Sequence, residues 1–301
     1  MQDTCDMHIH TNYSDGNLSG EELLLYAKEC GLKKLSITDH DCVDFYLDEK
    51  ALDLLKDFDY VPGCEFICAY DDVPIEILGY GINVQKAKEY LDVYGVNENK
   101  VERYRSDKVP KQFEKYGIVL DYNPECIDFS KKCPMVLETL HEVILQNPEA
   151  VRFLYQENPN LLTSVSAFLR EGLNNPASKI FIEPHTLYPT YDKITTLINE
   201  LGGLSFLAHP YQYGDNMNRV LEGVKKHVDG VECYHYTAME KTKVDNLKNF
   251  CKKHKLMISG GSDFHIQNLE GSDLLNKLEI PAKYFDEIKE KINAMQTQIE
   301  F

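Results

Sequence analysis

Histidine and carboxylate side chains, which are common ligands of divalent metal ions, recur in short clusters along the chain. The first cluster, DMHIHTNYSDG, places His8 and His10 one residue apart, with Asp15 five residues further on. In the segment TCDMHI, apolar and polar residues alternate with the period of a strand, so we expect both histidines on one strand face. Taken alone, such a pair is equally typical of a polar strand face and of a metal site.

Four further clusters follow segments that we predict to be strands. They are Asp39, His40 and Asp41 after LSIT, Glu65 after YVPG, His209 after LSFLA, and Asp263 and His265 after MISGGS. Because ligands of parallel α/β folds bind at the carboxyl ends of the strands, we expect these side chains to converge. A helix cap would also explain TDHD, and a glycine turn would explain SGGSDFH. The occurrence of such clusters after five predicted strands nevertheless favours a metal site. Ligands of this kind without cysteine favour Mn, Fe or Zn.

The elements between these clusters alternate between strands and helices. Ser19 and Glu22 have the spacing of a capping box, and the amphipathic helix that they open is predicted to end at Gly31. Segments 203–208, 230–234 and 255–259 are further predicted strands, so we expect a parallel sheet, either closed or open. Charged and Asn-Pro-containing segments replace this pattern in the middle of the chain. We therefore predict a main domain of residues 1–84 and 190–301 and an inserted, mostly helical subdomain of residues 85–189.

The composition limits the classes of partner. A chain of 301 residues with 43% hydrophobic residues can bury a sizeable core, but its formal charge of -17 makes extended binding to duplex nucleic acid unfavourable. Bound metal ions would supply the positive charge that a phosphate needs. Nine cysteines without a C-x-x-C pair suggest a reduced, cytoplasmic protein, and no apolar run is long enough to span a membrane.

The segments DMHIHTNYSDG, LSITDHD, VPGCEF, LAHP and GGSDFH together resemble the polymerase and histidinol phosphatase (PHP) family of metal-dependent phosphoesterases, in its stand-alone, nucleotide-acting branch. The resemblance implies a distorted seven-stranded β/α barrel with two or three metal ions. It implies three ligand sets: His8, His10, Glu65 and Asp263 for one metal, Asp15, His40 and His265 for a second, and Glu65 with His209 for a third. The chain departs from the family at Glu76, where relatives have a histidine; glutamate can bind the same metals.

The resemblance also implies roles in hydrolysis by a metal-bound hydroxide. Asp15, His40 and His209 are the predicted catalytic residues, with Asp6 and Asp39 behind the ligands. Arg105 and Lys108 are expected to contact substrate, although a solvated helix face would also explain them. Among the other histidines, His141 is expected on a helix surface, and His185 and His235 have no assigned role.

These features favour a phosphatase acting on a phosphomonoester of a small nucleotide, such as a nucleoside 3',5'-bisphosphate. A 5'-3' exonuclease on short single strands and a histidinol phosphate phosphatase are alternatives that use the same metals. A metal- or nucleotide-sensing module is the alternative without catalysis, and the Glu76 departure is the feature that motivates it. The oligomeric state does not follow from the sequence.

Overall fold

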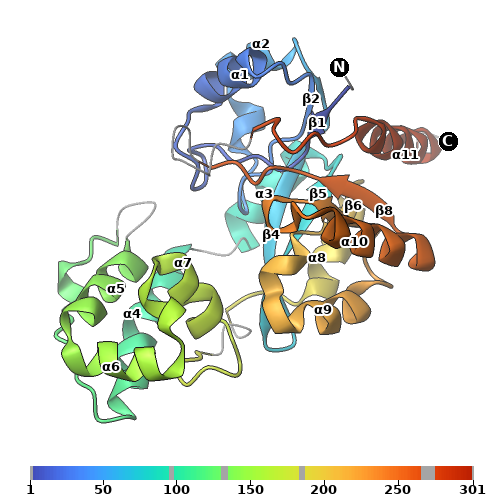
Figure 1. Cartoon of the computed structure of the whole chain (residues 1–301). Coiled ribbons are helices and arrows are strands. Elements are labelled where there is room, and N and C mark those ends of the chain that lie inside the picture. Colours follow the sequence, from blue (N-terminus) through green and yellow to red (C-terminus); the bar gives the residue numbers. More distant parts are fainter. Residues whose placement is uncertain (1–2, 95–97, 130–134, 183–186, 266–274, 300–301) are drawn as a thin grey trace. The chain divides into compact units, whose positions relative to one another are not determined.

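A computed structural model describes residues 3–94, 98–129, 135–182, 187–265 and 275–299 of the chain (Figure 1). The chain divides by its packing into two compact units. The first comprises Met1–Tyr70, Ile75–Gly95 and Pro189–Phe301, and the second comprises Asp71–Pro74 and Val96–Tyr188. Within the described residues, no helix has both the length and the apolar character needed to cross a membrane.

The strands form two sheets. A three-stranded sheet has the order β1-β2-β3, with β1 at Cys5–Asp6, β2 at Lys34–Leu35 and β3 at Asp59–Tyr60. A five-stranded sheet has the order β4-β5-β6-β7-β8, with bounds Gly63–Tyr70, Val73–Tyr80, Leu204–Leu207, Gly230–Tyr234 and Met257–Gly260. The mixed α/β class is thus confirmed.

The five-stranded sheet departs at β5 from the parallel arrangement that the sequence predicts. The pairs β1–β2, β2–β3, β6–β7 and β7–β8 are parallel, but β5 runs antiparallel to β6. Two residues, Asp71 and Asp72, link β4 to its neighbour β5, and parallel neighbours need a crossover of a dozen or more residues, so the chain reverses its direction between these two strands.

Backbone hydrogen bonds connect the two sheets beyond the ends of the short strands. The N–H of Met7 donates to the carbonyl of Gly260 (3.1 Å), which joins β1 to β8. The N–H of Thr38 donates to the carbonyl of Ile9 (2.9 Å), and that of Glu65 donates to the carbonyl of Thr38 (3.2 Å). The segments that follow β1 and β2 therefore lie beside β8 and β4, respectively.

Local sequence accounts for the first helix. Helix α1 spans Gly20–Glu29, and its capping box is formed by Ser19 and Glu22 as predicted. The chain leaves the helix at Gly31, whose φ of +74° is a conformation that glycine adopts without strain. The predicted start and end of this helix are confirmed.

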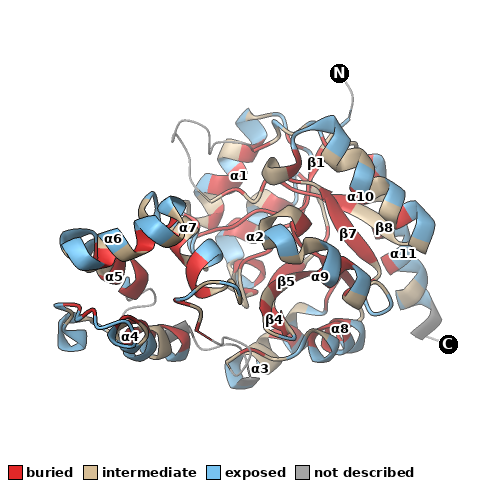
Figure 2. Cartoon of the chain, turned by 60° about the horizontal axis from the view of Figure 1, so that its bottom comes forward, coloured by how far each residue is buried: buried red, intermediate tan, exposed pale blue. Residues whose placement is uncertain are grey.

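The other helices of the first unit cover the sheets. They are η1 (Asp44–Leu47), α2 (Glu49–Leu55), α3 (Val84–Tyr94), α8 (Tyr191–Glu200), η5 (Pro210–Asn216), α9 (Met217–Val224), η6 (Tyr236–Ala238), α10 (Lys241–His254) and α11 (Lys283–Ile299). Helix α8 packs on β4 and β6, α10 packs on β7 and β8, and α11 packs on β8. Figure 2 shows the strands as buried and the outer faces of these helices as exposed. Burial of this kind holds the strand ends rigidly in place.

The second unit has its own core. In its described part, the segment Val96–Tyr188 contains helices and no strand: α4 (Glu98–Glu114), η2 (Pro124–Cys126), α5 (Val136–Gln146), α6 (Pro148–Glu157), η3 (Pro159–Leu162), α7 (Val165–Ala167) and η4 (Phe168–Leu173). Phe113, Leu140, Leu154 and Phe168 are fully buried in one apolar cluster. A core of this kind is the usual mark of a separate folding unit.

Candidate metal centre

The two histidines of the first cluster come from the end of β1 and are fully buried. The Nε2 atoms of His8 and His10 lie 3.1 and 3.4 Å from Oε2 of Glu65. The same two atoms lie 3.4 and 3.2 Å from Oδ1 of Asp263. Four donor atoms from three strands therefore face one another in the interior of the first unit.

Glu65 lies at the middle of the cluster. The sequence expects it after a strand end, whereas in the structure it is a residue of β4, with a fully buried side chain. Its carboxylate also lies 3.2 Å from Nδ1 of His40 and 3.1 Å from Nε2 of His209. One carboxylate thus contacts four histidines, an arrangement suited to bridging two metal ions.

A second group of residues lies at the solvent side of the cluster. Asp15 is 3.2 Å from Nε2 of His265 and 3.7 Å from Nε2 of His40. Their side chains are 48%, 27% and 30% exposed, whereas those of His8 and His10 are inaccessible. A ligand from solvent can therefore reach this side of the cluster.

Glu76, the residue at which the chain departs from the family pattern, also joins the cluster. Its Oε2 lies 3.0 Å from Nε2 of His209, and its Oε1 lies 4.0 Å from Nδ1 of His40. The β5 side chain thus occupies a place from which it can offer an oxygen ligand.

Three overlapping groups of donor atoms could each hold one metal ion. Within each group all donor atoms lie within 4.8 Å of one another: His8, His10, Glu65 and Asp263; His10, Asp15, His40 and His265; and His40, Glu65 and Glu76. These groups resemble the sets that the sequence predicts.

The donor atoms are arranged for binding a metal ion rather than for hydrogen bonds with one another. Nε2 of His8, Nε2 of His10 and Oε2 of Glu65 are buried and make no hydrogen bond with the described residues. Buried polar atoms without partners are rare and costly. Ligand atoms about 2.1 Å from one tetrahedral ion lie roughly 3.4 Å apart, which matches the separations of 3.1–3.4 Å in this group.

Opposite charges stabilise each other throughout the cluster. Burial disfavours a charge on His209, but bonds to Glu65 and Glu76 outweigh this effect and raise its pKa to about 10. Burial likewise disfavours a charge on His265, but the hydrogen bond to Asp15 and nearby carboxylates raise its pKa to about 9. Because metals bind deprotonated ligands, an ion that enters the cluster has to displace these protons.

Asp6 and Asp39 support loops next to the cluster. Asp6 accepts a hydrogen bond from the backbone N–H of Ser262 (2.9 Å), and burial raises the pKa of its carboxyl to about 6. Asp39 accepts from the backbone N–H and the hydroxyl of Thr11 (both 2.7 Å) and from the hydroxyl of Ser14 (2.6 Å). Neither carboxylate forms a salt bridge with a histidine of the described chain, so both act on the ligands through the backbone and hydroxyl groups.

Two residues that the sequence analysis leaves without a role also contact the cluster. Glu232 of β7 is fully buried, and its Oε1 lies 3.0 Å from Nδ1 of His8. Nε2 of His235, one residue beyond β7, lies 3.2 Å from Oδ2 of Asp263. For Glu232 the sequence did contain a weak signal, since a charged residue inside the otherwise apolar segment GVECY is unusual.

The predicted substrate residues belong to the second unit. Arg105 pairs with Glu102 at 2.5 Å and is 14% exposed, so its guanidinium is partly engaged within α4. Lys108 is 44% exposed and lies 5.5 Å from the ring centroid of Tyr104.

His141, expected on a helix surface, is buried instead, with Nε2 3.1 Å from the carbonyl of Leu161. That prediction was wrong because His141 shares a helix face with the buried apolar residues Leu137 and Ile144. His185 lies outside the described residues.

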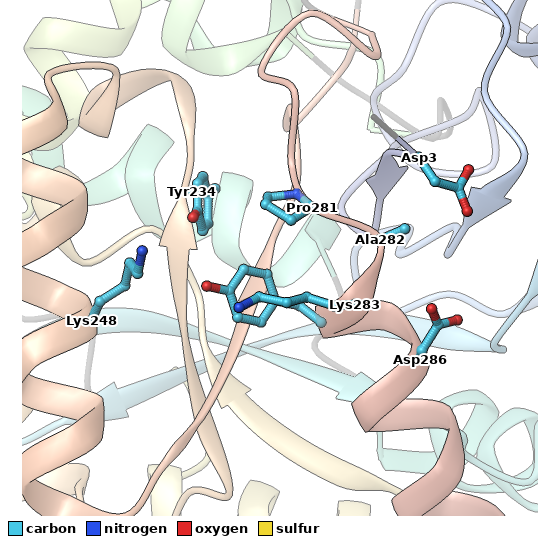
Figure 3. A pocket seen from close by; sticks show the side chains of 8 residues that line it. Asp3, Tyr234, Lys248, Pro281, Ala282, Lys283 and Asp286 are labelled. Atoms are coloured by element: carbon cyan, nitrogen blue, oxygen red, sulfur yellow. The ribbon is translucent and has the colours of Figure 1, made fainter. Parts of the chain in front are cut away.

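A cavity of about 440 Å³ in the first unit is a different feature (Figure 3). Tyr234, Tyr284, Lys248 and Lys283 are among the side chains that line it, together with two aspartates at one end. None of the candidate ligands is among its lining residues. The candidate active site is therefore the histidine–carboxylate cluster.

The fold and the cluster define an α/β protein with a histidine–carboxylate cluster that could hold metal ions. The PHP domain family matches residues 6–237, and the chain belongs to this family. The predicted family is thereby confirmed, as is the predicted class of enzyme, a metal-dependent hydrolase of phosphoric esters.

Relatives with established names cover nearly the whole chain. A 3',5'-nucleoside bisphosphate phosphatase of Chromobacterium violaceum is 24% identical over 289 residues, which cover 92% of either chain. The 5'-3' exoribonuclease Rnm of Escherichia coli is 24% identical over 298 residues, which cover 92% of this chain and 90% of the relative. Among solved structures, a proposed metal-dependent phosphoesterase of Bifidobacterium adolescentis has a TM-score of 0.65 at 18% identity over 94% of either chain, and it shares the fold.

Proposed function

We propose that the chain removes a phosphate from a small nucleotide, such as a nucleoside 3',5'-bisphosphate, with two or three divalent ions of Mn, Fe or Zn. The observation that carries the proposal is the set of three overlapping donor groups, which share His10, His40 and Glu65. Shared ligands would hold the ions side by side. The activity named for the relative of Chromobacterium violaceum supports the choice of substrate.

Three ligand sets that overlap these donor groups would each hold one ion. The proposed ligands are His8, His10, Glu65 and Asp263 for the first ion, Asp15, His40 and His265 for the second, and Glu65, Glu76 and His209 for the third. In the third set His209, whose Nε2 lies 3.1 Å from Glu65 and 3.0 Å from Glu76, takes the place of His40 in the corresponding donor group. When bound, such ions lower the pKa of a coordinated water and neutralise phosphate oxygens. This local positive charge is needed in a chain with a formal charge of -17.

The exposed side of the cluster would receive the phosphate. Asp15, His40, His265 and Glu76 are the accessible members, and the inaccessible His8 and His10 close the opposite side to water. Whichever of His40 and His209 does not bind an ion would give a proton to the leaving oxygen, since a metal-bound imidazole nitrogen has no proton to give and a free imidazole is well suited to proton transfer near neutral pH. Asp15, through its contacts with both exposed histidines, would orient them.

The insert would supply the remaining substrate contacts. We assign to residues 85–189 the role of a substrate-binding subdomain, with Arg105 and Lys108 as phosphate contacts. We also propose that both sheets belong to one distorted seven-stranded barrel in which β3 and β4 count as one strand; the hydrogen bonds that connect the sheets support this arrangement. The described cysteines form no disulfide, which supports a cytoplasmic location.

A 5'-3' exonuclease activity on short single strands is the second candidate. The exoribonuclease Rnm of Escherichia coli, which matches this chain over 298 residues, favours it. Both reactions attack a phosphorus atom with a hydroxide, so the same metal cluster would serve either of them.

Assays of free phosphate and of released mononucleotides, both with added Mn²⁺, test the proposal and separate the candidates. Adenosine 3',5'-bisphosphate, a 5'-phosphorylated tetraribonucleotide and histidinol phosphate form the panel of substrates. We expect the bisphosphate to be hydrolysed fastest. Preferential hydrolysis of the tetraribonucleotide to mononucleotides would favour the exonuclease, and no turnover of any substrate would contradict both.

A further inference from the structure

Glu232 connects two of the candidate ligands from a strand that supplies none of them. Its side chain is fully buried in β7. Oε1 lies 3.0 Å from Nδ1 of His8, and Oε2 accepts a hydrogen bond from the backbone N–H of His209 at 2.7 Å. Both carboxylate oxygens are thus used, one for each of two histidines from different strands.

The contact with His8 determines which ring nitrogen is free. A carboxylate can only accept, so in the neutral ring that a metal ion requires, Nδ1 has to carry the hydrogen and Nε2 keeps its lone pair. That Nε2 is the buried atom that faces Glu65 and Asp263 without a hydrogen bond to the described residues. A metal ligand needs this tautomer, and the partner of the other ring nitrogen fixes it.

The contact with His209 holds an unusual backbone conformation. His209 has a φ of +24°, which residues other than glycine rarely adopt and which persists only where surrounding interactions hold it. Its N–H bond to Glu232 is one such interaction, and Nε2 of its ring contacts Glu65 and Glu76. Glu232 therefore places the His209 ring next to the proposed third ion.

We propose that Glu232 is the positioning residue of the metal centre: it fixes the His8 tautomer and the His209 backbone, and thereby sets the metal affinity. The inference rests on the proposed function, because it takes His8 and His209 to be ligands. Outer partners of metal-bound histidines typically change metal affinity about 10- to 100-fold when they are replaced.

The substitution Glu232→Gln tests this role with almost no change in size. An amide has one accepting oxygen, but the two donors at this position require two. The N–H of the His209 backbone cannot change, so the amide NH₂ would turn toward Nδ1 of His8. Nδ1 would then have to accept, and the hydrogen would move to Nε2, which blocks the ligand atom.

Two measurements on zinc-loaded protein follow from this argument. Equilibrium dialysis with Zn²⁺ should show an affinity about 10- to 100-fold lower for Glu232→Gln than for the wild type. Nitrogen-15 histidine spectra of the zinc-loaded wild type should show the hydrogen of His8 on Nδ1. The spectrum needs no variant, so it tests the inference even if Glu232→Gln does not fold.

Asp229→Asn is the matched control. Asp229 lies just before β7 and accepts hydrogen bonds from the backbone N–H and the hydroxyl of Ser205 (2.9 and 3.2 Å). Both bonds go to one oxygen, Oδ2, which the amide of Asn can replace, so this variant should leave both the Zn²⁺ affinity and the His8 resonance unchanged.

The outcomes distinguish a failure of the proposed function from a failure of the inference about Glu232. A wild-type chain that binds no zinc contradicts the proposed function, and the inference with it. A wild-type chain that binds zinc with the His8 hydrogen on Nε2 overturns the inference alone. An unchanged Zn²⁺ affinity in a folded Glu232→Gln variant does the same, since Glu232 would then act as a purely structural group.

Discussion

Gly261→Ala should damage the metal centre although glycine has no side chain to contribute. A Cβ atom built on Gly261 would lie 2.1 Å from Cβ of His8 and 2.4 Å from its backbone nitrogen. Ordinary contacts between carbon atoms are about 3.5–4.0 Å, so the turn after β8 and the end of β1 would have to separate by more than ~1 Å. The turn carries Asp263, and the segment that follows β1 carries His8 and His10.

The structure gives the size of the expected effect. The turn is held to β1 by the hydrogen bonds from Met7 N–H to Gly260 O (3.1 Å) and from Asp263 N–H to His8 O (2.8 Å). Overpacking of this kind typically costs about 1–3 kcal/mol, and each lost hydrogen bond adds about 1 kcal/mol. A displacement of ~1 Å in a catalytic group can lower the rate about 100-fold.

Urea unfolding and Mn²⁺-dependent phosphate release measure the two effects. Gly31→Ala is the control. A Cβ on Gly31 would meet no other atom, so the substitution adds only the backbone strain of a φ of +74°. The control should lose about 1–2 kcal/mol of stability and keep its activity. If Gly261→Ala had wild-type activity, the close packing of the turn on His8 would not be what positions Asp263.

The remaining predictions concern individual groups and the metal itself. His10→Ala should abolish phosphate release, because His10 belongs to two of the three donor groups; near wild-type turnover would contradict the assignment. Arg105→Ala should mainly raise KM, and an unchanged KM would remove Arg105 from the substrate contacts. Glu76→His should alter the order of activity among Mn²⁺, Zn²⁺ and Fe²⁺, because it exchanges an oxygen for a nitrogen ligand; the same order in both proteins would place Glu76 outside the metal shell. Dialysis against EDTA should abolish activity and Mn²⁺ should restore it, and activity that survives full removal of metal would refute metal dependence.

Local signals explain what could be predicted from the sequence. The first helix begins and ends where the capping box of Ser19 and Glu22 and the glycine at position 31 place it, because these signals act within one turn. The convergence of the clusters was predicted from the rule that the carboxyl ends of parallel strands meet at one edge of a sheet. The structure shows this for the segments that follow β1 and β8, where Ile9 and Phe264 pair in parallel.

Features that depend on tertiary packing could not be predicted in the same way. Glu232 contacts His8 across 224 residues, and nothing near it in sequence specifies that partner. The pairing of Arg105 with Glu102, in contrast, joins residues three apart on one helix, and the sequence did contain this signal. The burial of His141 also follows a helix face that the apolar pattern of α5 displays.

The number of metal ions per chain tests the central claim most directly. Elemental analysis of protein purified without chelator should find at least two ions of Mn, Fe or Zn per wild-type chain. The cluster around the buried Glu65 leads to this expectation, since it has ligands for more than one ion. Fewer than two ions per chain, in protein that is folded and was never exposed to chelator, would contradict the account.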